Sequence, residues 1–553
     1  MKTALLVLGL WSAVSVSAQE PQSPAFRTRV TQTLLDGISN LFNNATLIKS
    51  TLNGIISGDR IFIDRLEARR TIHFEPPNVL HVKANETYII WEQRMELPDE
   101  NEVKHEGVVA FHIKNATFDL KLSFNRSARN TLRMYVANCT VDAGTLEGNL
   151  DKFEGATDYM RSFANLVGNV LKSKASGICL MLKSKLNGHF AKLANHSPIV
   201  GGADTGGPRF DLSLTGPPTA TDQYLQFDML GLPFQGATPS DDPLSQQFDP
   251  HPLVDSLNSS MMFYGVISDE LPTHVLRVMH ATGRLPSFQI ANTEGVSQVL
   301  YNKLNSVVLD AARKLHVNIQ IPSDEAYTVT PAEPPLIRFM PNTEQPTRAV
   351  VVSGPVDIEF HVEGDGTRSK IVARVDLEAY FNGQIHASAD RSLPRVTLAG
   401  HVSKAAIQSV SGLPADVVFS EEVKRHASAQ LQKKLHRTLH QAVEMAELAV
   451  NAATTAWTHG DEPITRALFS VFSIPRARVS AARHTAMLGF DIGVDVHKFP
   501  MLLQAVASRR EDVDDTDLYN FGSMGSSESS ESNEVDPGAG AQTPAFIFAR
   551  YLF

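Results

Sequence analysis

Long amphipathic helices alternate with strand-like sequence, and this order occurs twice along the chain. In the first half, apolar residues in steps of three and four predict helices from Val30 to Ile55 and from Phe163 to Leu193. The sequence between them alternates apolar and polar residues, which is typical of antiparallel strands with one face in water. The second half repeats this plan, with predicted helices from Val296 to Leu315 and from about residue 421 to 457.

A chain of 553 residues is too long for one hydrophobic core, so we expect two domains of similar α+β architecture. Lys2, the apolar run after it and the small residues ending at Ala18 predict an export signal. The predicted segments are a signal peptide at 1–18, an N-terminal domain at 22–215, a proline-rich linker and central-sheet region at 216–255, a C-terminal domain at 256–500 and an acidic disordered tail at 509–553.

The net charge of −10 comes almost entirely from one short segment near the C-terminus. Between Glu511 and Asp536 there are nine acidic residues and no basic residue, so the rest of the chain is nearly neutral. No basic stripe with interleaved aromatic residues occurs, which argues against nucleic acid as a partner. After the signal, no apolar run reaches the length of about 18 residues that a membrane-spanning helix needs.

No catalytic motif stands out, and we expect a protein that is not an enzyme and has no cofactor and no metal. His436 and His440 lie one helical turn apart, but no glutamate or third ligand accompanies them, so a solvated helix face is the better interpretation. Asp357, Glu359 and Glu363 alternate along one predicted strand, which favours the wet face of a sheet over an acid/base pair.

Cys139 and Cys179 are the only cysteines, and in the oxidising compartment that the signal implies we expect them to pair. The same compartment makes N-glycosylation possible, which marks surface positions in a secreted protein. The seven Asn-x-Ser/Thr sites are Asn44, Asn85, Asn115, Asn125, Asn138, Asn195 and Asn258.

Several segments together resemble one family of lipid-binding proteins. They are the opening Ser23 to Gly37, the two cysteines 40 residues apart, the Phe163 to Leu193 helix, Met261 to Asp269 followed by His280 to Leu285, Pro334 to Pro341, and the closing Leu488 to Asp495. In this order they resemble the family of bactericidal/permeability-increasing protein, lipopolysaccharide-binding protein, and the phospholipid and cholesteryl ester transfer proteins. The resemblance covers about residues 22 to 497.

The resemblance implies a boomerang of two tandem barrels of antiparallel strands, each with long helices, joined by a central sheet. It also implies a secreted, extracellular, monomeric protein that holds phospholipid in an apolar pocket of each barrel and meets a membrane or lipoprotein surface transiently. Periodicity gives the buried helix faces but does not separate core from pocket. The lining residues expected for the N-terminal lipid-binding barrel are Leu34, Ile38, Leu41, Phe163, Val167, Val170 and Leu171.

The alternative function is innate defence through binding of lipopolysaccharide or other microbial envelope lipids. The family's endotoxin-binding members carry lysines at the N-terminal tip. Here the corresponding segment from Glu92 to Glu106 has six acidic residues and only Arg94 and Lys104 as basic ones. Tight capture of phosphate calls for converging Lys or Arg, so this composition disfavours endotoxin and favours neutral or zwitterionic phospholipid.

Overall fold

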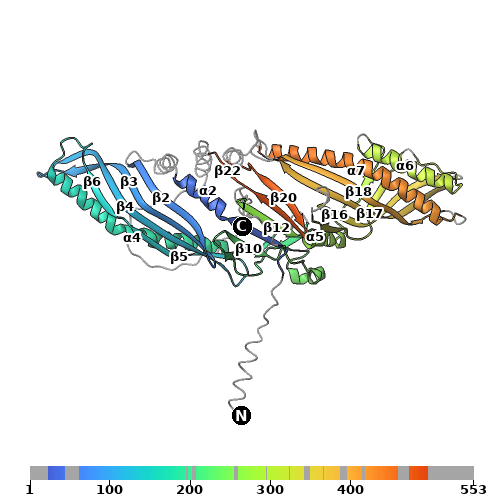
Figure 1. The fold of residues 1–553 in the computed structure, drawn as a ribbon, viewed down its shortest axis with the longest axis horizontal. Coiled ribbons are helices and arrows are strands. Elements are labelled where there is room, and N and C mark those ends of the chain that lie inside the picture. The colour runs from blue at the N-terminus through green and yellow to red at the C-terminus, as the bar shows by residue number, and fades with distance from the viewer. Residues whose placement is uncertain are drawn as a thin grey trace, which may run out of the picture.

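The computed structural model forms an elongated molecule, with strands at both ends and a sheet in the middle (Figure 1). It describes residues 23–43, 61–194, 197–201, 207–254, 260–293, 296–322, 324–341, 349–364, 367–386, 395–413, 417–458 and 472–495. The predicted signal peptide and acidic tail lie outside the described residues. No described helix is both long and apolar enough to cross a membrane.

The central sheet draws its strands from widely separated parts of the chain. In order across the sheet they are β20 (Ala477–Ala482), β21 (Thr485–Phe490), β12 (Phe263–Ser268), β1 (Phe26–Thr31), β10 (Tyr224–Met229) and β9 (Thr219–Ala220). All of these pairs are antiparallel. Strand β1 lies between β10 of the proline-rich region and β12 of the C-terminal half, so it joins three predicted segments in one sheet.

The N-terminal half consists of an antiparallel sheet of long strands with a long helix packed on it (Figure 1). The elements are β2 (Ile61–Glu75), β3 (Val79–Pro98), β4 (Lys104–Arg126), β5 (Leu132–Asp142), β6 (Thr145–Asn149), α2 (Gln32–Asn43) and α4 (Asp158–Ala194). Helix α4 contacts β5 and β6, whereas α2 contacts β2. One core, around Phe111, Leu97 and Met160, lies beneath the first turns of α4.

The C-terminal half repeats this arrangement with different strands. Its sheet contains β13 (Phe288–Ile290), β14 (Tyr327–Pro331), β15 (Leu336–Phe339), β16 (Val350–Gly364), β17 (Thr367–His386) and β18 (Arg395–Ser411), all antiparallel. Helix α7 (Glu421–Thr458) packs along β18, and α6 (Val296–Lys314) packs against α7. The described residues thus form a mixed α and β fold built on several antiparallel sheets.

Short elements complete the middle of the molecule. They are α5 (Glu270–Ala281), the 3-10 turns η1 (Pro239–Asp241) and η2 (Pro243–Gln247), and the strands β7 (Ile199–Val200), β8 (Arg209–Asp211), β11 (Leu232–Phe234), β19 (Phe472–Ser473) and β22 (Gly493–Val494). Asp242 caps η2, because its carboxylate accepts hydrogen bonds from the backbone N–H groups of Leu244 and Gln235 at 2.9 and 2.8 Å.

The predicted helices Phe163–Leu193, Val296–Leu315 and 421–457 are confirmed by α4, α6 and α7. The predicted start of the first helix at Val30 is wrong. Val30 is the fifth residue of β1, where it pairs with Leu225 and Phe263, and the helix begins at Gln32. Hydrogen bonds to strands on both sides of β1 satisfy its backbone N–H and C=O groups. The stability gained from this pairing outweighs the helical preference that the spacing of its apolar residues indicates.

Several predicted strands are longer than their apolar alternation indicates. The segments 78–82 and 87–92 belong to the single strand β3, whose ladder with β4 shifts register between Ala84 and Ile89. Glu86 there has φ of 51°, a bulge geometry that carries the strand past an irregular stretch. The apolar residues of 317–321 favour a strand, but this segment contributes one isolated bridge from Gln320 to Glu363.

The disulfide expected between Cys139 and Cys179 is present, with an S–S distance of 1.98 Å. It ties β5 to the middle of α4, and Cys179 is buried beneath the helix. Because the two residues are 40 apart, the bond removes much of the conformational freedom of the loop between them in the unfolded chain.

We expect Cys179→Ala to lower the free energy of unfolding of the N-terminal half by about 4 kcal/mol, from loop-closure entropy. Denaturant unfolding followed by far-UV circular dichroism measures this loss, and reduced secretion should accompany it. Cys139→Ala is the matched control. It should cause the same loss, and the double variant should lose no more, because all three remove one bond. An additive double variant would show that the cysteines stabilise the fold separately.

Candidate functional site

The C-terminal half contains an apolar cavity of about 540 Å³ between its sheet and its two long helices. This volume falls in the range of about 300–1,000 Å³ that is typical of small-molecule sites. The cavity is lined from three directions, by one face of α6, by the inner face of strands β16 to β18, and by the start of α7. The residues that form these faces include Leu304, Val307 and Ala311, then Ile358, Phe360, Val362, Ile371, Ala373 and Val375, then Ala427 and Leu431.

Strand alternation explains why the lining is apolar. On β16, Ile358, Phe360 and Val362 face the cavity, and their register partners Ala373 and Ile371 on β17 do the same. The residues between them face outward. Asp357 pairs with Arg374 at 2.9 Å and Glu359 pairs with Lys370 at 2.7 Å. These acidic residues therefore form ion pairs on the wet face of the sheet, as the sequence indicated.

Polar lining residues gather at one end of this cavity. His316 and Asn318 follow α6, while Thr367 and Ser369 begin β17. These two segments meet because Gln320 and Glu363 exchange backbone hydrogen bonds of 2.8 Å in both directions. Among the described lining residues there is no Lys, Arg, Asp or Glu. The cavity thus has an apolar interior and a polar end whose described residues include no Lys, Arg, Asp or Glu.

Tyr327 lines the cavity, and its one polar side-chain group is hydrogen-bonded within the protein. Its side chain is fully buried, and its hydroxyl donates a hydrogen bond of 2.6 Å to Oδ1 of Asn305. Burial raises the pKa of Tyr327 above its ordinary value, so the phenol stays neutral. Its ring packs against Tyr301 and Phe360, with ring centroids 5.6 and 5.0 Å away.

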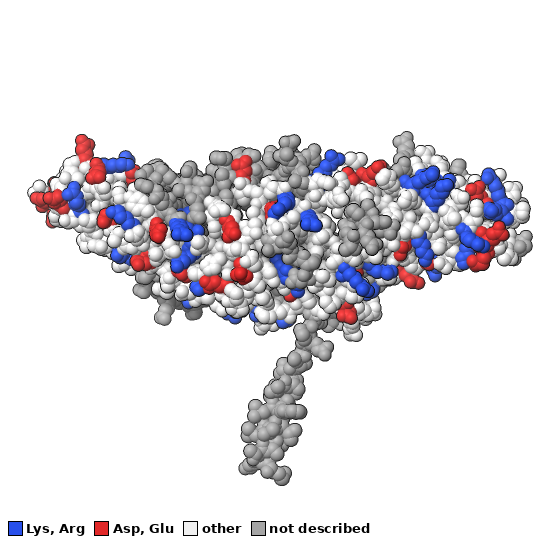
Figure 2. All heavy atoms as spheres, viewed as in Figure 1, with Lys and Arg blue, Asp and Glu red and all other residues white. Residues whose placement is uncertain are grey.

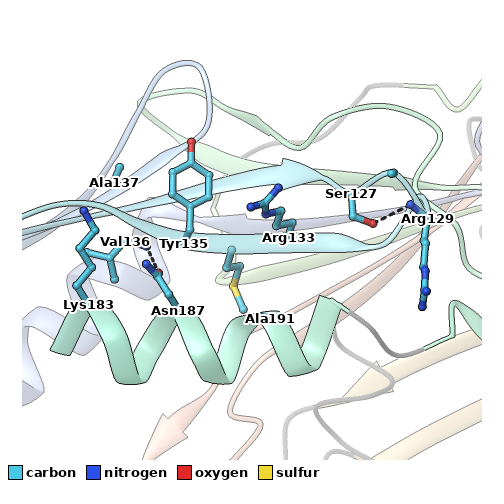
Figure 3. A pocket seen from close by; sticks show the side chains of 11 residues that line it. Ser127, Arg129, Arg133, Tyr135, Val136, Ala137, Lys183, Asn187 and Ala191 are labelled. Carbon is cyan, nitrogen blue, oxygen red and sulfur yellow. Dashed lines mark hydrogen bonds between the residues drawn. The ribbon is translucent and has the colours of Figure 1, made fainter. Parts of the chain in front are cut away.

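A second cavity, of about 630 Å³, lies in the N-terminal half between β5 and the C-terminal half of α4 (Figure 3). Met134, Tyr135 and Val136 line it from the strand, and Asn187 and Ala191 line it from the helix. Asn187 spans the two elements, because its Oδ1 accepts a hydrogen bond of 2.7 Å from the backbone N–H of Val136. This bond fixes the spacing of helix and strand at the cavity.

Three exposed cations distinguish the N-terminal cavity from the C-terminal one. Arg133 comes from β5, Arg129 from the turn before it and Lys183 from α4. In Figure 3 the three side chains lie around the opening between the strand and the helix. None of them has an ion pair within the part of the chain that the structure describes. Such cations suit an anionic group such as a phosphate.

The structure describes the side chains of five of the seven predicted lining residues, and it does not bring these five together. Leu34 and Ile38 pack against the core around Leu225 and Phe227, whereas Phe163 and Val167 pack against the core beneath the first turns of α4. Val170 is 51% exposed on the outer face of α4. Of these five, none lines either cavity described above. The side chains of Leu41 and Leu171 lie outside the described ones, and the lining role of all seven stays a prediction.

The cavity-lining residues of the second half carried a signal in the sequence. Leu304, Val307 and Ala311 belong to the apolar stripe that predicted α6, and that stripe now faces the cavity. The polar end could not be foreseen, because His316 and Thr367 meet only through the pairing of two distant segments. His436 and His440 are exposed on α7, in agreement with the solvated helix face predicted for them.

The hairpin between β3 and β4 forms one end of the molecule. Figure 2 shows acidic side chains gathered at the left-hand end, toward which β3 and β4 run in Figure 1. Both basic residues of this hairpin are engaged, because Lys104 lies 3.4 Å from Glu96 and Arg94 lies 3.9 Å from Glu106. A hydrogen bond from His105 keeps the pKa of Asp99 below its ordinary value, so this carboxylate stays ionised.

Four of the seven predicted glycosylation sites fall on described residues. Asn115 and Asn138 are exposed, whereas Asn85 and Asn125 are half-buried. Nδ2 of Asn125, the atom that would carry the sugar, lies 3.4 Å from the hydroxyl of Tyr135 at the N-terminal cavity. Asn115 and Asn138 are therefore the more accessible sites. Asn44, Asn195 and Asn258 lie outside the described residues.

Comparison with known proteins leaves the ligand open. No protein-family model matches the sequence, and no curated protein matches it. Among solved structures, the crystal structure of a lipopolysaccharide binding protein aligns with 86% of this chain and 99% of its own length, at 14% identity and a TM-score of 0.45. At that identity and score the likeness bears on neither the ligand nor the activity of this chain.

Proposed function

We propose that this protein is a secreted lipid-binding protein that carries phospholipid between membrane or lipoprotein surfaces. The observation that carries the proposal is the C-terminal cavity, which has an apolar interior and a polar end without Lys, Arg, Asp or Glu among its described residues. An amphipathic molecule with acyl chains and a polar headgroup matches this division. The proposal includes the finer architecture that the sequence resemblance implies, in which each half closes around its pocket as a barrel and the two form a boomerang.

The energetics favour carriage without covalent chemistry. Each CH₂ group left in water costs about 0.8 kcal/mol, so exposure of a 16-carbon chain costs on the order of 12 kcal/mol. An apolar cavity offsets nearly all of this cost, as a bilayer does. Exchange between the two is therefore close to thermoneutral, and its rate depends on how the cavity opening meets the membrane. No catalytic group, metal or cofactor takes part in this proposed function.

An exposed apolar residue beside the C-terminal cavity supports contact with a lipid surface. Val417 and Phe419 line the cavity, and Val418 between them is 78% exposed. In the N-terminal half, Arg129, Arg133 and Lys183 offer positive charge for a phospholipid phosphate. Each cavity thus offers features that suit a phospholipid of its own, namely positive charge in the N-terminal half and an apolar lining in the C-terminal half.

Filling the C-terminal cavity tests the proposed binding. We expect Ala373→Trp to reduce the phospholipid that co-purifies with the protein to less than half, because the indole occupies space the acyl chain needs. Val372→Trp is the matched control, since Val372 is the adjacent residue of β17 and faces away from the cavity. Native mass spectrometry reads the bound lipid. Equal lipid content in both variants and the unsubstituted protein would refute the proposed site.

Transfer can be tested separately from binding. We expect Val418→Asp to slow transfer of fluorescent phosphatidylcholine between vesicles several-fold, because a carboxylate at this exposed position disfavours contact with the apolar part of a membrane. Lipid content at equilibrium should stay unchanged. Val418→Leu is the control and should transfer at the original rate. An aspartate variant that transfers at full speed would exclude this segment from membrane contact.

We expect weak endotoxin binding at the β3–β4 hairpin, because its carboxylates repel phosphates and its two cations are already paired. Binding to vesicles with and without lipid A, below and above an ionic strength of about 0.1 M, measures this. Glu96→Lys combined with Glu100→Lys should increase binding at low salt. Tight binding that falls as salt rises, and that drops in Arg94→Ala and Lys104→Ala, would favour the innate-defence alternative.

A further inference from the structure

Two histidines and one aspartate meet at the edge of the central sheet, outside both cavities. They are His251 in the irregular segment after η2, Asp269 immediately before α5, and His484 in the turn between β20 and β21. Nδ1 of His484 lies 2.9 Å from Oδ2 of Asp269, and Nδ1 of His251 lies 3.4 Å from Oδ1 of the same residue. One ligand atom from each residue thus falls within 4.8 Å of the others.

The buried carboxylate of Asp269 has few hydrogen-bond donors around it. Its side chain is 4% exposed, and Oδ1 accepts no hydrogen bond from any residue that the structure describes. Oδ2 has His484 and a long contact of 3.4 Å from the backbone N–H of Phe339. A buried carboxylate without full hydrogen bonding is costly unless a cation compensates it. Arg277, a nearby cation, is paired with Glu270 instead.

The backbone holds two of the three residues in place. The N–H of Asp269 donates a hydrogen bond of 3.1 Å to the carbonyl of His484, and the N–H of His484 donates one of 3.1 Å to the carbonyl of Phe339. The segment that carries His251 is attached by the N–H of Val254, which donates to Oγ1 of Thr485 at 3.3 Å. Main-chain hydrogen bonds therefore fix Asp269 and His484, and the contact of Val254 with Thr485 keeps the segment of His251 beside them.

We propose that His251, Asp269 and His484 bind one zinc ion, which fastens the segment after η2 to the central sheet. Zinc takes imidazole nitrogen and carboxylate oxygen at about 2.0–2.2 Å in a tetrahedron, so its ligand atoms lie about 3.3 Å apart. The distances of 2.9 Å from His484 to Oδ2 and 3.4 Å from His251 to Oδ1 are close to this spacing. They involve the two different oxygens of Asp269, and the ligand atoms of the three residues lie within 4.8 Å of one another, so the set has to contract around the ion. Water fills the fourth position on the side of His251, whose side chain is about half exposed.

Zinc binding requires one local adjustment. The two imidazole rings are stacked, with centroids 3.9 Å apart and planes 11° apart. Zinc lies in the plane of each imidazole that binds it, so the rings have to diverge toward a common point. His251 is the residue that moves, because it lies in an irregular segment and is exposed, whereas the backbone hydrogen bonds of His484 fix that residue.

A second cluster of the same residue types is already satisfied and provides a control. His73, Glu75 and His81 converge on the N-terminal sheet. There Nζ of Lys121 donates to Glu75 at 2.8 Å, which with His81 lowers the pKa of Glu75 to about 2. The other ring nitrogen of His81 lies 3.0 Å from Asp119. A metal at this cluster would have to displace a lysine, so we expect no tight site there.

To test the proposal, metal is first removed from the untagged full-length protein with a chelating agent. The protein is then titrated with ZnCl₂ in competition with a chromophoric chelator. One equivalent should bind, and His251→Asn and His484→Asn should each weaken binding by about 100-fold or more. His73→Asn should leave it unchanged. Asparagine suits position 484, whose φ is 63°. Equal metal-free melting temperatures for His251→Asn and the original protein establish that folding is intact.

Two outcomes would overturn the proposal. One is the same number and affinity of zinc sites in His251→Asn as in the unsubstituted protein, and the other is loss of the site in His73→Asn. Hydrogen exchange gives an independent measurement, because zinc should slow exchange of the amides near His251 in the unsubstituted protein and leave it unchanged in His484→Asn. Neither measurement depends on lipid, so the metal site and the proposed lipid function fail or succeed separately.

Discussion

Pairing of strand β1 on both edges holds the molecule together. Phe26–Thr31 forms antiparallel ladders with β10 on one side and β12 on the other, which joins segments about 200 residues apart in sequence. Side chains reinforce these ladders. Arg27 forms a two-pronged ion pair with Asp228 at 2.6 and 3.2 Å, and the Thr31 hydroxyl donates a hydrogen bond of 2.6 Å to the carbonyl of Met261. Loss of β1 would divide the central sheet between β10, which shares a core with the N-terminal half, and β12 of the C-terminal half.

This arrangement divides the fold into local and non-local parts. The sheets of the two halves are made largely of hairpins between consecutive strands, such as β3 with β4 and β16 with β17, so their loop-closure cost is small. In the central sheet only the β20–β21 and β9–β10 ladders are local, and the ladders of β1 with β10, β1 with β12 and β12 with β21 join distant segments of the chain. This sheet is therefore the part of the fold with the highest cost of ordering, and a metal at its edge would reduce that cost by fixing the segment that leads to β12.

The sequence predicted those features that depend on local periodicity. The apolar stripes of α4 and α7 were long enough to predict both helices, because a helix of 37 or 38 residues repeats its apolar pattern many times. Strand β1 was missed since its six residues carry too short a pattern to compete with the helical spacing that continues into α2.

The predicted lining residues Leu34 and Phe163 are apolar positions on the inner faces of helices, yet the structure packs them in two cores. Periodicity identifies a buried face, and only the packing of other elements decides whether that face meets side chains or a cavity. The convergence of Asp269 with His484, 215 residues away, has no sequence signal at all.

The two cavities differ in charge although the two halves share an architecture, and this difference limits how each can be used. The N-terminal cavity has Arg129, Arg133 and Lys183 exposed around it, whereas the described lining of the C-terminal cavity has no ionisable group except His316 and Tyr327. An exposed cation attracts a phosphate over about 8 Å at physiological salt, so the first cavity favours the headgroup of an incoming lipid. In the second cavity the desolvation of any charged group would be uncompensated, so its interior favours hydrocarbon. Equivalent occupation of the two cavities by one kind of anionic lipid is therefore unfavourable. Under the proposed function, the duplicated architecture provides two cavities for lipid, and the side chains around each cavity determine which part of the lipid it stabilises.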